Sequence, residues 1–430
     1  MVAWRYLARL ERQVARWNLK VTLQGQDTQI ADSKIWPGLD SLWSFMWCLD
    51  RNNAKDISVF SLLDVAKRKE VTNSNDLVYG ILGLTKKAIR DRVNINYDLP
   101  ATQVYIDFLA SNLPQDTVLE LFGQVSGPTN RKHQLWDLSI PSWCPLRPWM
   151  VKTTRDPNFV LGAAEGLRAG YHAGFNGLFQ EKSLCTTFDS SGLVQLQGYK
   201  VDRVLETVAT TELHDGSDPL NGTGASELLL WESRCFDLAA KTLIHSAVYP
   251  QTSQPEASEK DLVSEIQTTS LEKMLNSYTR TLIANRECVF DGLEWRYRAF
   301  TGKSTMEGDP EFADTIAQYQ NWKAFLEKIK AAKEGDVLPT RNPYLVMHVS
   351  YRRDFFATEH GRIGWGPEGV EAGDVIAVFD NGIIPHILRP RKSNKPMMLV
   401  GDAYVDGLMY GEVFNLEEEG IVALSRIEIS

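Results

Sequence analysis

The sequence predicts an α+β fold: a mostly helical N-terminal lobe, then an antiparallel β-meander or small barrel that carries a helical insertion. Short apolar runs separated by Pro and Gly fill the stretch 344–412, and this pattern is typical of antiparallel strands. Upstream, the region 226–333 has apolar residues at helical spacing together with helix caps. We therefore expect a first domain over residues 1–150 and a second over 151–430.

The stretch 344–412 contains five predicted strands. Apolar runs on both sides of Asn381-Gly382 predict a hairpin with a type I′ turn, because both central residues of that turn need positive φ. Pro385 has no N–H group, so its strand is expected to be an edge strand or to carry a bulge there. The strands are expected at residues 344–349, 354–358, 374–379, 383–388 and 397–405.

Elsewhere the pattern is mainly helical. An amphipathic helix is expected over residues 1–20, two helical pieces over 34–70, and a helix that begins at Pro100 with Val104, Phe108 and Leu109 facing inward. Strands near 193–210 are expected to join the C-terminal sheet, an expectation that draws on the family resemblance described below. The helices of the insertion are predicted at residues 226–249, 259–285 and 309–333.

Composition excludes several classes of protein. The net charge of −9 argues against bulk binding of nucleic acid, which requires a basic face. Five scattered cysteines without a Cys-x-x-Cys pair indicate reduced intracellular thiols. No apolar run approaches 18 residues, so no transmembrane segment is expected.

Residues that could carry chemistry have structural alternatives. The segment from Gly364 to Gly369 matches G-x-G-x-x-G, but Pro367 and Gly373 lead into another strand instead of a helix, so no cofactor is predicted. His348, His360 and His386 could converge on a metal ion, yet the tight spacing of structural metal sites is absent and no metal is predicted.

Two groups of charged side chains remain open. One is either a patch for an anionic partner or a sheet rim that discourages edge pairing, and it comprises Arg352, Arg353, Arg389, Arg391, Lys392 and Lys395. Glu359 and Asp374 could act as acid or base, but without an identifiable partner they are interpreted as turn residues.

Several motifs resemble those of fungal heterokaryon-incompatibility (HET) proteins, in order as well as in identity. They are FFATEHGRIGWGP at 355–367, GDVI at 373–376, IPHILRP at 384–390 and LVGDAYVDGLMYGE at 399–412. Further upstream, DLVYGILGL at 76–84 and IPSWCP at 140–145 resemble the end of the HET domain, although Asn73, Ser74 and Asn75 replace its first acid, proline and arginine. The matching positions are Asp76, Tyr79, Gly83, Pro141, Trp143, Gly361, Gly364, Gly366, Pro367, Gly373, Asp374, Pro385, Arg389, Pro390, Gly401, Tyr404, Gly407 and Gly411.

The resemblance implies a cytoplasmic protein of non-self recognition and programmed cell death, with protein partners in incompatibility signalling. The family's Ser-Tyr-x-Trp-Gly and Asp-x-x-Cys-Ile-Asn-Gln elements are not found in residues 1–72. We therefore expect a truncated member that retains a helical remnant of the HET domain and lacks most of the effector. No NAD-cleaving activity is expected from it.

The alternative hypothesis is an enzyme with an unrecognised active site between the helical insertion and the C-terminal sheet. It predicts a deep pocket where polar side chains converge near Trp365, His386 and Arg389. A recognition protein instead predicts shallow surfaces with exposed apolar patches.

Overall fold

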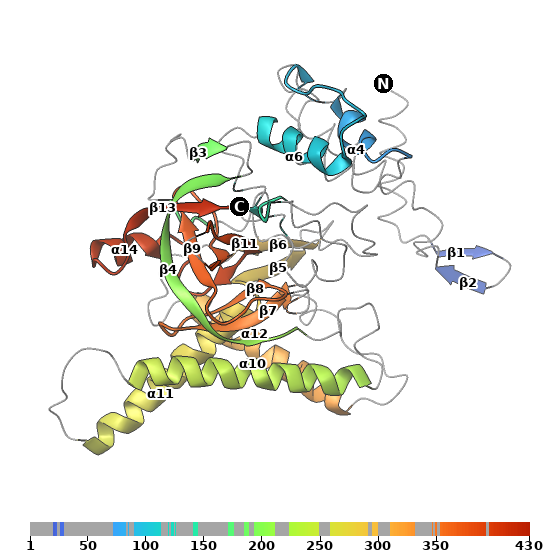
Figure 1. The fold of residues 1–430 in the computed structure, drawn as a ribbon. Coiled ribbons are helices and arrows are strands. Elements are labelled where there is room, and N and C mark those ends of the chain that lie inside the picture. Colours follow the sequence, from blue (N-terminus) through green and yellow to red (C-terminus); the bar gives the residue numbers. More distant parts are fainter. Residues whose placement is uncertain are drawn as a thin grey trace. The chain divides into compact units, whose positions relative to one another are not determined.

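The computed structural model (Figure 1) describes the C-terminal half most completely. The described residues are 20–23, 26–29, 72–82, 90–112, 141–144, 171–175, 185–188, 193–210, 223–248, 259–290, 295–299, 310–331, 353–392 and 395–430, together with positions 85, 119, 122–123, 125, 346 and 349–350. Two compact units are distinguished: the first holds Met1–Leu113 and two short segments, and the second holds Pro114–Leu146, Thr153–Asp291 and Trp295–Ser430. The division after residue 150 stays a prediction.

In the first unit, strands β1 (Lys20–Leu23) and β2 (Gln26–Gln29) form a hairpin, and the helices are α4 (Asp76–Tyr79) and α6 (Ala101–Asn112). Helix α6 begins directly after Pro100, and its Val104, Phe108 and Leu109 side chains are buried as predicted. The helices predicted over 1–20 and 34–70 lie outside the described residues, apart from Lys20, which opens β1.

Strand β4 (Val194–Val208) is the centre of the second unit. Its 15 residues are long enough to pair with four other strands. Both β3 (Cys185–Phe188) and β13 (Leu424–Ile429) pair with Val194–Leu196, so they lie on opposite edges of β4. Two register shifts, at Lys200/Asp202 and Val204/Glu206, bend the strand, since a bulge increases local twist.

The remaining strands continue from both edges of β4 in the order β11-β10-β9-β4-β7-β8-β12. The bounds are β7 (Arg353–Thr358), β8 (Ile363–Pro367), β9 (Val375–Phe379), β10 (His386–Arg389), β11 (Met398–Asp402) and β12 (Tyr404–Val405). The predicted antiparallel sheet shared by residues 193–204 and 344–412 is therefore confirmed, because β4 pairs with both β7 and β9.

Three details of the prediction are wrong. The sheet is not a simple meander, because β4 separates β7 from β9. It is also not closed into a barrel: between β11 and β13, the described residues show one parallel bridge, Met397 to Ile429. Residues 344–349 were predicted as a strand, but the described positions Val346 and Val349 are helical.

The hairpin at Asn381-Gly382 exists in a different form. Strands β9 and β10 pair antiparallel, but β10 begins at His386, so the connection is longer than two residues. Only Asn381 has positive φ (56°), which excludes a type I′ turn. Pro385 precedes β10, and this strand pairs on both sides, so it is not an edge. The register with β11 shifts between Ile387 and Leu388, where the extra residue is Val400 of β11, so β10 carries no bulge at Pro385.

Three helices cover one face of the sheet, as Figure 1 shows: α10 (Thr223–Val248), α11 (Glu259–Leu282) and α12 (Pro310–Ala331). They confirm the predicted helical insertion. The hairpin of β5 (Arg286–Phe290) and β6 (Trp295–Ala299) within it was not predicted.

Because both faces of β7 are covered, its six residues are all buried. Phe355 and Ala357 pack with the helices, whereas Phe356 packs on the opposite face. That second core includes Val413 of α14 (Glu412–Glu418), the short helix before β13.

Candidate functional site

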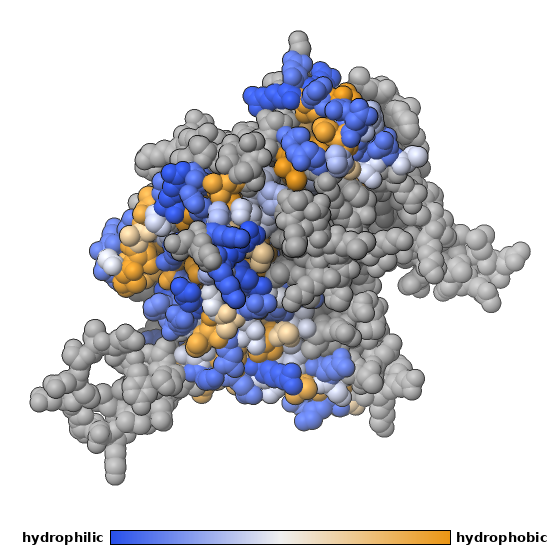
Figure 2. All heavy atoms as spheres, in the orientation of Figure 1, coloured by the Kyte–Doolittle hydropathy of each residue, from blue (hydrophilic) through white to orange (hydrophobic). Residues whose placement is uncertain are grey.

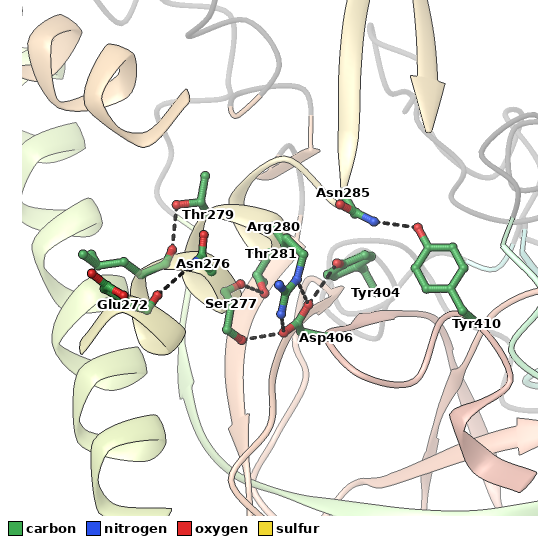
Figure 3. Close-up of polar contacts among 11 residues, drawn as sticks. Glu272, Asn276, Ser277, Thr279, Arg280, Thr281, Asn285, Tyr404, Asp406 and Tyr410 are labelled. Carbon is green, nitrogen blue, oxygen red and sulfur yellow. Dashed lines mark hydrogen bonds and ion pairs between the residues drawn. The ribbon is translucent and has the colours of Figure 1, made fainter. Parts of the chain in front are cut away.

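An ion pair joins helix α11 to the loop that follows β12 (Figure 3). Arg280 donates to both carboxylate oxygens of Asp406, through Nε at 2.9 Å and Nη2 at 2.8 Å, in the planar geometry that favours arginine. The Ser277 hydroxyl also donates to Asp406, and the Tyr404 hydroxyl lies 3.4 Å from it. Asp406 raises the pKa of the Arg280 guanidinium above its ordinary value. The contact is therefore a charged clamp between helix α11 and the family-motif segment 399–412.

Helical spacing explains how α11 presents this clamp. Ser277 and Arg280 are three residues apart, so they share one face of the helix. The buried hydroxyls of Thr279 and Thr281 are satisfied within the helix, each donating to the carbonyl four residues earlier. The two threonine hydroxyls thus carry no penalty for an unpaired donor, whereas the buried Oδ1 atom of Asn276, one turn away, has no hydrogen-bond partner among the described residues.

The end of α11 is held by a cluster of three tyrosines, Tyr171, Tyr404 and Tyr410. Ala284 and Asn285 both have a φ of 48°, and the Asn285 N–H donates to the Arg280 carbonyl to close the helix. The Asn285 amide donates to the Tyr410 hydroxyl at 2.7 Å, and the Tyr171 hydroxyl donates to the Ala284 carbonyl.

Burial affects the ionisation of two of these tyrosines. Burial raises the pKa of Tyr404 and of Tyr410 above the ordinary phenol value, so both stay protonated near neutral pH. The carboxylate of Asp406 is already occupied by Arg280 and Ser277. The arrangement is therefore suited to fixing the chain and offers no group ready for proton transfer.

A second buried carboxylate organises the loop between β7 and β8. Asp202, whose side chain is fully buried, accepts hydrogen bonds from Thr358 and Arg362, each at 2.8 Å, and contacts Nδ1 of His360 at 2.8 Å. His360 itself is mostly exposed. Nothing in the sequence patterns singled out Asp202, because strand β4 contains several other polar and charged residues.

The three residues that the enzyme hypothesis placed at one pocket have separate surroundings. Trp365 donates to the Thr281 carbonyl at 2.6 Å and stacks on Trp231. His386 is fully buried between Phe122 and Phe379, and burial lowers its pKa to about 4. Arg389 is bound by the Asp374 and Glu371 carboxylates. These side chains do not share a set of contacts.

The other candidate residues also have separate partners and do not form one site. Arg353 is buried and paired with Asp402 at 2.6 Å, so the proposed basic patch does not include it. Arg391 binds Ser430, and Asp374 holds Arg389 and accepts from the Glu371 N–H. His348 and Arg352 lie outside the described residues. In the part of the chain that the structure describes, no three His, Cys, Asp or Glu side chains are grouped to hold a metal ion.

Most glycines and prolines of the family motifs are required by the backbone conformation or by close packing against it. At Gly364 a Cβ would lie 2.3 Å from the Tyr404 carbonyl, and at Gly366 it would meet the Ile387 side chain. Positive φ occurs at Gly361, Gly373, Gly401, Gly407 and Gly411. Pro367 packs against Gly401, and Pro385 and Pro390 flank β10.

The motif residues of the first half have comparable roles. Asp76 accepts from the Tyr97 hydroxyl and Tyr79 donates to the Asn96 carbonyl, while Gly83 lies outside the described residues. Trp143 is fully buried and the Pro141 carbonyl accepts from the Cys144 N–H. Between Pro141 and Trp143, Ser142 donates to the Ser430 carbonyl and accepts from the Leu399 N–H, a role that the sequence patterns did not indicate.

A bent antiparallel sheet centred on one long strand, with three inserted helices packed on it, defines an α+β domain and not a nucleotide-binding fold. Residues 192–421 match the family described as "Het-6 beta-barrel domain", and the chain belongs to this family of fungal heterokaryon-incompatibility proteins. The predicted resemblance is thus confirmed, although the sheet of this chain is not a closed barrel.

The chain is similar to "Heterokaryon incompatibility protein 6, OR allele" of Neurospora crassa, with 33% identity over 113 residues. That alignment covers 26% of this chain and 16% of the length of that protein. No solved structure matches the chain. None of the helices in the described part is long and apolar enough to cross a membrane.

Proposed function

We propose that this protein acts in non-self recognition during heterokaryon incompatibility and triggers death of the fused cell when the partner is incompatible. The match of residues 192–421 to the Het-6 family carries this proposal. The similarity to a Neurospora crassa protein named for heterokaryon incompatibility supports it. The reaction to a foreign partner would take place in the cytoplasm, where the contents of two fused cells mix.

The geometry favours recognition of a protein over chemistry on a small molecule. Arg280, Asp406 and the tyrosine cluster are used in internal contacts, and so are Arg353, Arg389 and Asp202. Side chains that bind one another inside the domain stabilise a single conformation of it. Specificity would then reside in exposed side chains around this fixed core, and the partners would be proteins.

Transformation of wild isolates tests the proposal even while the partner protein is unidentified. A panel of isolates from the encoding species would receive the gene or an empty vector, and viable transformants would be counted. In a subset of isolates we expect far fewer viable transformants with the gene than with the vector, because incompatible cells die. Compatible isolates should yield equal numbers with both.

A matched control uses Asp406→Asn, which removes the clamp between α11 and the loop after β12. This variant should restore transformant numbers in the sensitive isolates if the folded domain is responsible. Equal numbers with gene and vector in every isolate would refute the proposal. Uniform killing of all isolates would also refute it, because toxicity without discrimination is not recognition.

A further inference from the structure

One edge of strand β13 has free hydrogen-bonding groups. The Glu428 carbonyl accepts from the Met397 N–H at 2.7 Å and the Ser430 N–H donates to the Met397 carbonyl at 3.1 Å, so these residues point away from β4. Backbone direction alternates along a strand, and Leu424 and Arg426 therefore also point away from β4. Among the described residues, no hydrogen-bond partner contacts their N–H and C=O groups.

Exposed apolar side chains lie beside this edge. Leu424 is 44% exposed and Ile421 is 59% exposed, high values for large apolar residues in an ordered region. Leu424 lies opposite Tyr199 in the ladder, and the Tyr199 hydroxyl donates to Glu417 of α14, so Tyr199 links this end of β13 to the helix. Figure 2 shows hydrophobic surface next to hydrophilic surface on the α14 side of the molecule. Free strand edges next to apolar side chains are sites where another strand can add.

The charges on the exposed face of β13 indicate what kind of strand would fit. Leu424, Arg426 and Glu428 share this face and are exposed, whereas Ile427 and Ile429 point inward and are buried. Glu428 accepts from the Gln195 amide, but within the described residues Arg426 has no carboxylate partner. An acidic side chain opposite Arg426 would therefore be favourable, since opposite charges on directly paired positions stabilise a sheet.

A second copy of this chain fits the edge poorly. A two-fold axis at Ser425 would place Leu424 opposite Arg426 of the other copy, which pairs an apolar side chain with a charge. An axis at Arg426 would oppose two guanidinium groups. The favourable pairing of Arg426 with Glu428 of the other copy would require the segment where Met397 already binds Glu428.

We propose that β13 binds an extended segment of another protein, which adds to the sheet as an antiparallel strand through Leu424 and Arg426. The bound segment carries an acidic residue opposite Arg426 and, two residues later, an apolar residue opposite Leu424. This inference rests on the proposed function, for which it supplies the surface that contacts the partner protein.

Fluorescence polarisation with a synthetic peptide tests the assignment on the full chain. The probe is fluorescein-labelled Thr-Glu-Val-Ile-Thr with a capped C-terminus, and the comparison peptide has Lys in place of Glu. We expect the Glu peptide to bind more tightly than the Lys peptide by about fivefold, as a direct cross-strand charge pair implies. Arg426→Glu should reverse this order while the thermal midpoint of the protein stays within a degree or two of the wild-type value, since Arg426 is exposed.

Two further measurements separate strand addition from simple charge attraction. N-methylation of the Glu residue of the peptide removes the N–H that would donate to the Arg426 carbonyl, so the labelled peptide should lose most of its binding. Arg426→Pro removes the outward N–H while the ladder to β4 is retained, and should have the same effect.

Other results would overturn the inference: equal affinity for both peptides, no effect of N-methylation, or a dimer in sedimentation that Arg426→Pro dissociates. Failure of peptide binding together with discrimination among isolates would remove this inference alone. Peptide binding without such discrimination would leave the surface assigned and refute the proposed function.

Discussion

His386 gives a quantitative test of the packing around β10. The side chain is fully buried, its two ring nitrogens have no hydrogen-bond partner among the described residues, and its ring centroid lies 5.9 Å from that of Phe122 and 5.3 Å from that of Phe379. Burial disfavours the charged imidazolium and lowers the pKa of His386 from 6.5 to about 4, although the nearby Asp402 partly offsets this. Replacement by Phe keeps an aromatic ring of similar size and removes the titratable group.

The sign of the pH effect follows from this lowered pKa. The unfolded chain takes up a proton at His386 below pH 6.5, whereas the folded protein does so only near pH 4. The contribution to stability is therefore complete above pH 6.5 and is lost as the pH falls from 6.5 towards 4. Between pH 7 and pH 5 the loss amounts to about 2 kcal/mol, because each pH unit of this interval below 6.5 costs about 1.4 kcal/mol.

Urea unfolding followed by tryptophan fluorescence at pH 7 and pH 5 measures this term. The difference in unfolding free energy between the two pH values should be about 2 kcal/mol smaller in His386→Phe than in the wild type. Phe122→Leu is the matched control: it disturbs the same ring cluster without removing a titratable group, so it should lower stability equally at both pH values. If His386→Phe and the wild type lose the same stability between pH 7 and pH 5, His386 is not held neutral by burial and this packing is wrong.

Four substitutions test other contacts by thermal unfolding. Gly364→Ala should destabilise the protein by about 3 kcal/mol, because the added Cβ would meet the Tyr404 carbonyl. Gly407→Ala is the control: its φ is 78° and nothing lies near its Cβ, so it should cost only about 1 kcal/mol. Equal effects of the two substitutions would contradict the close approach of Gly364 to Tyr404. Asp406→Asn should cost about 2 kcal/mol through the lost pair with Arg280, and a neutral result would mean that the clamp is not formed in solution. Asn285→Ala should cost about 1 to 2 kcal/mol, because it loses the Tyr410 contact and places Ala at positive φ, and an unchanged midpoint would exclude this helix end.

Local patterns predicted most elements of the second unit and failed where contacts distant in sequence decide the outcome. The apolar runs at β7, β9 and β11 were found because buried strands are short and bounded by Gly or Pro. The pair Asn381-Gly382 located the hairpin but not its turn, since Asn381 N–H also donates to the Gly174 carbonyl and the loop is shaped by that contact. The apolar pattern around Val346 is compatible with a strand or a helix, so it cannot decide between them. Val346 and Val349 are helical and are buried in the core that contains residues of the three helices.

The candidate site was only partly accessible from the sequence. Motif resemblance identified the segment 399–412, which contains Asp406, but no spacing rule indicates that Asp406 meets Arg280, because the two residues are far apart in the chain. Glycines of the motifs were identified without their function, which depends on what each Cβ would strike. The buried carboxylates Asp202 and Asp402 could not be recognised, because a strand pattern does not reveal which polar residue finds a partner.

The central position of β4 has a consequence for biosynthesis. Its partners β7, β9 and β13 are all encoded after the helical insertion, so the ribosome must complete α10, α11 and α12 before the strand can pair along most of its length. During that interval the nascent strand exposes unpaired apolar residues, a condition that favours chaperone binding and slow, late folding. A premature stop soon after the codons for α12 would therefore leave β4 without β7, β9 and β13, and the cell would be expected to degrade the product.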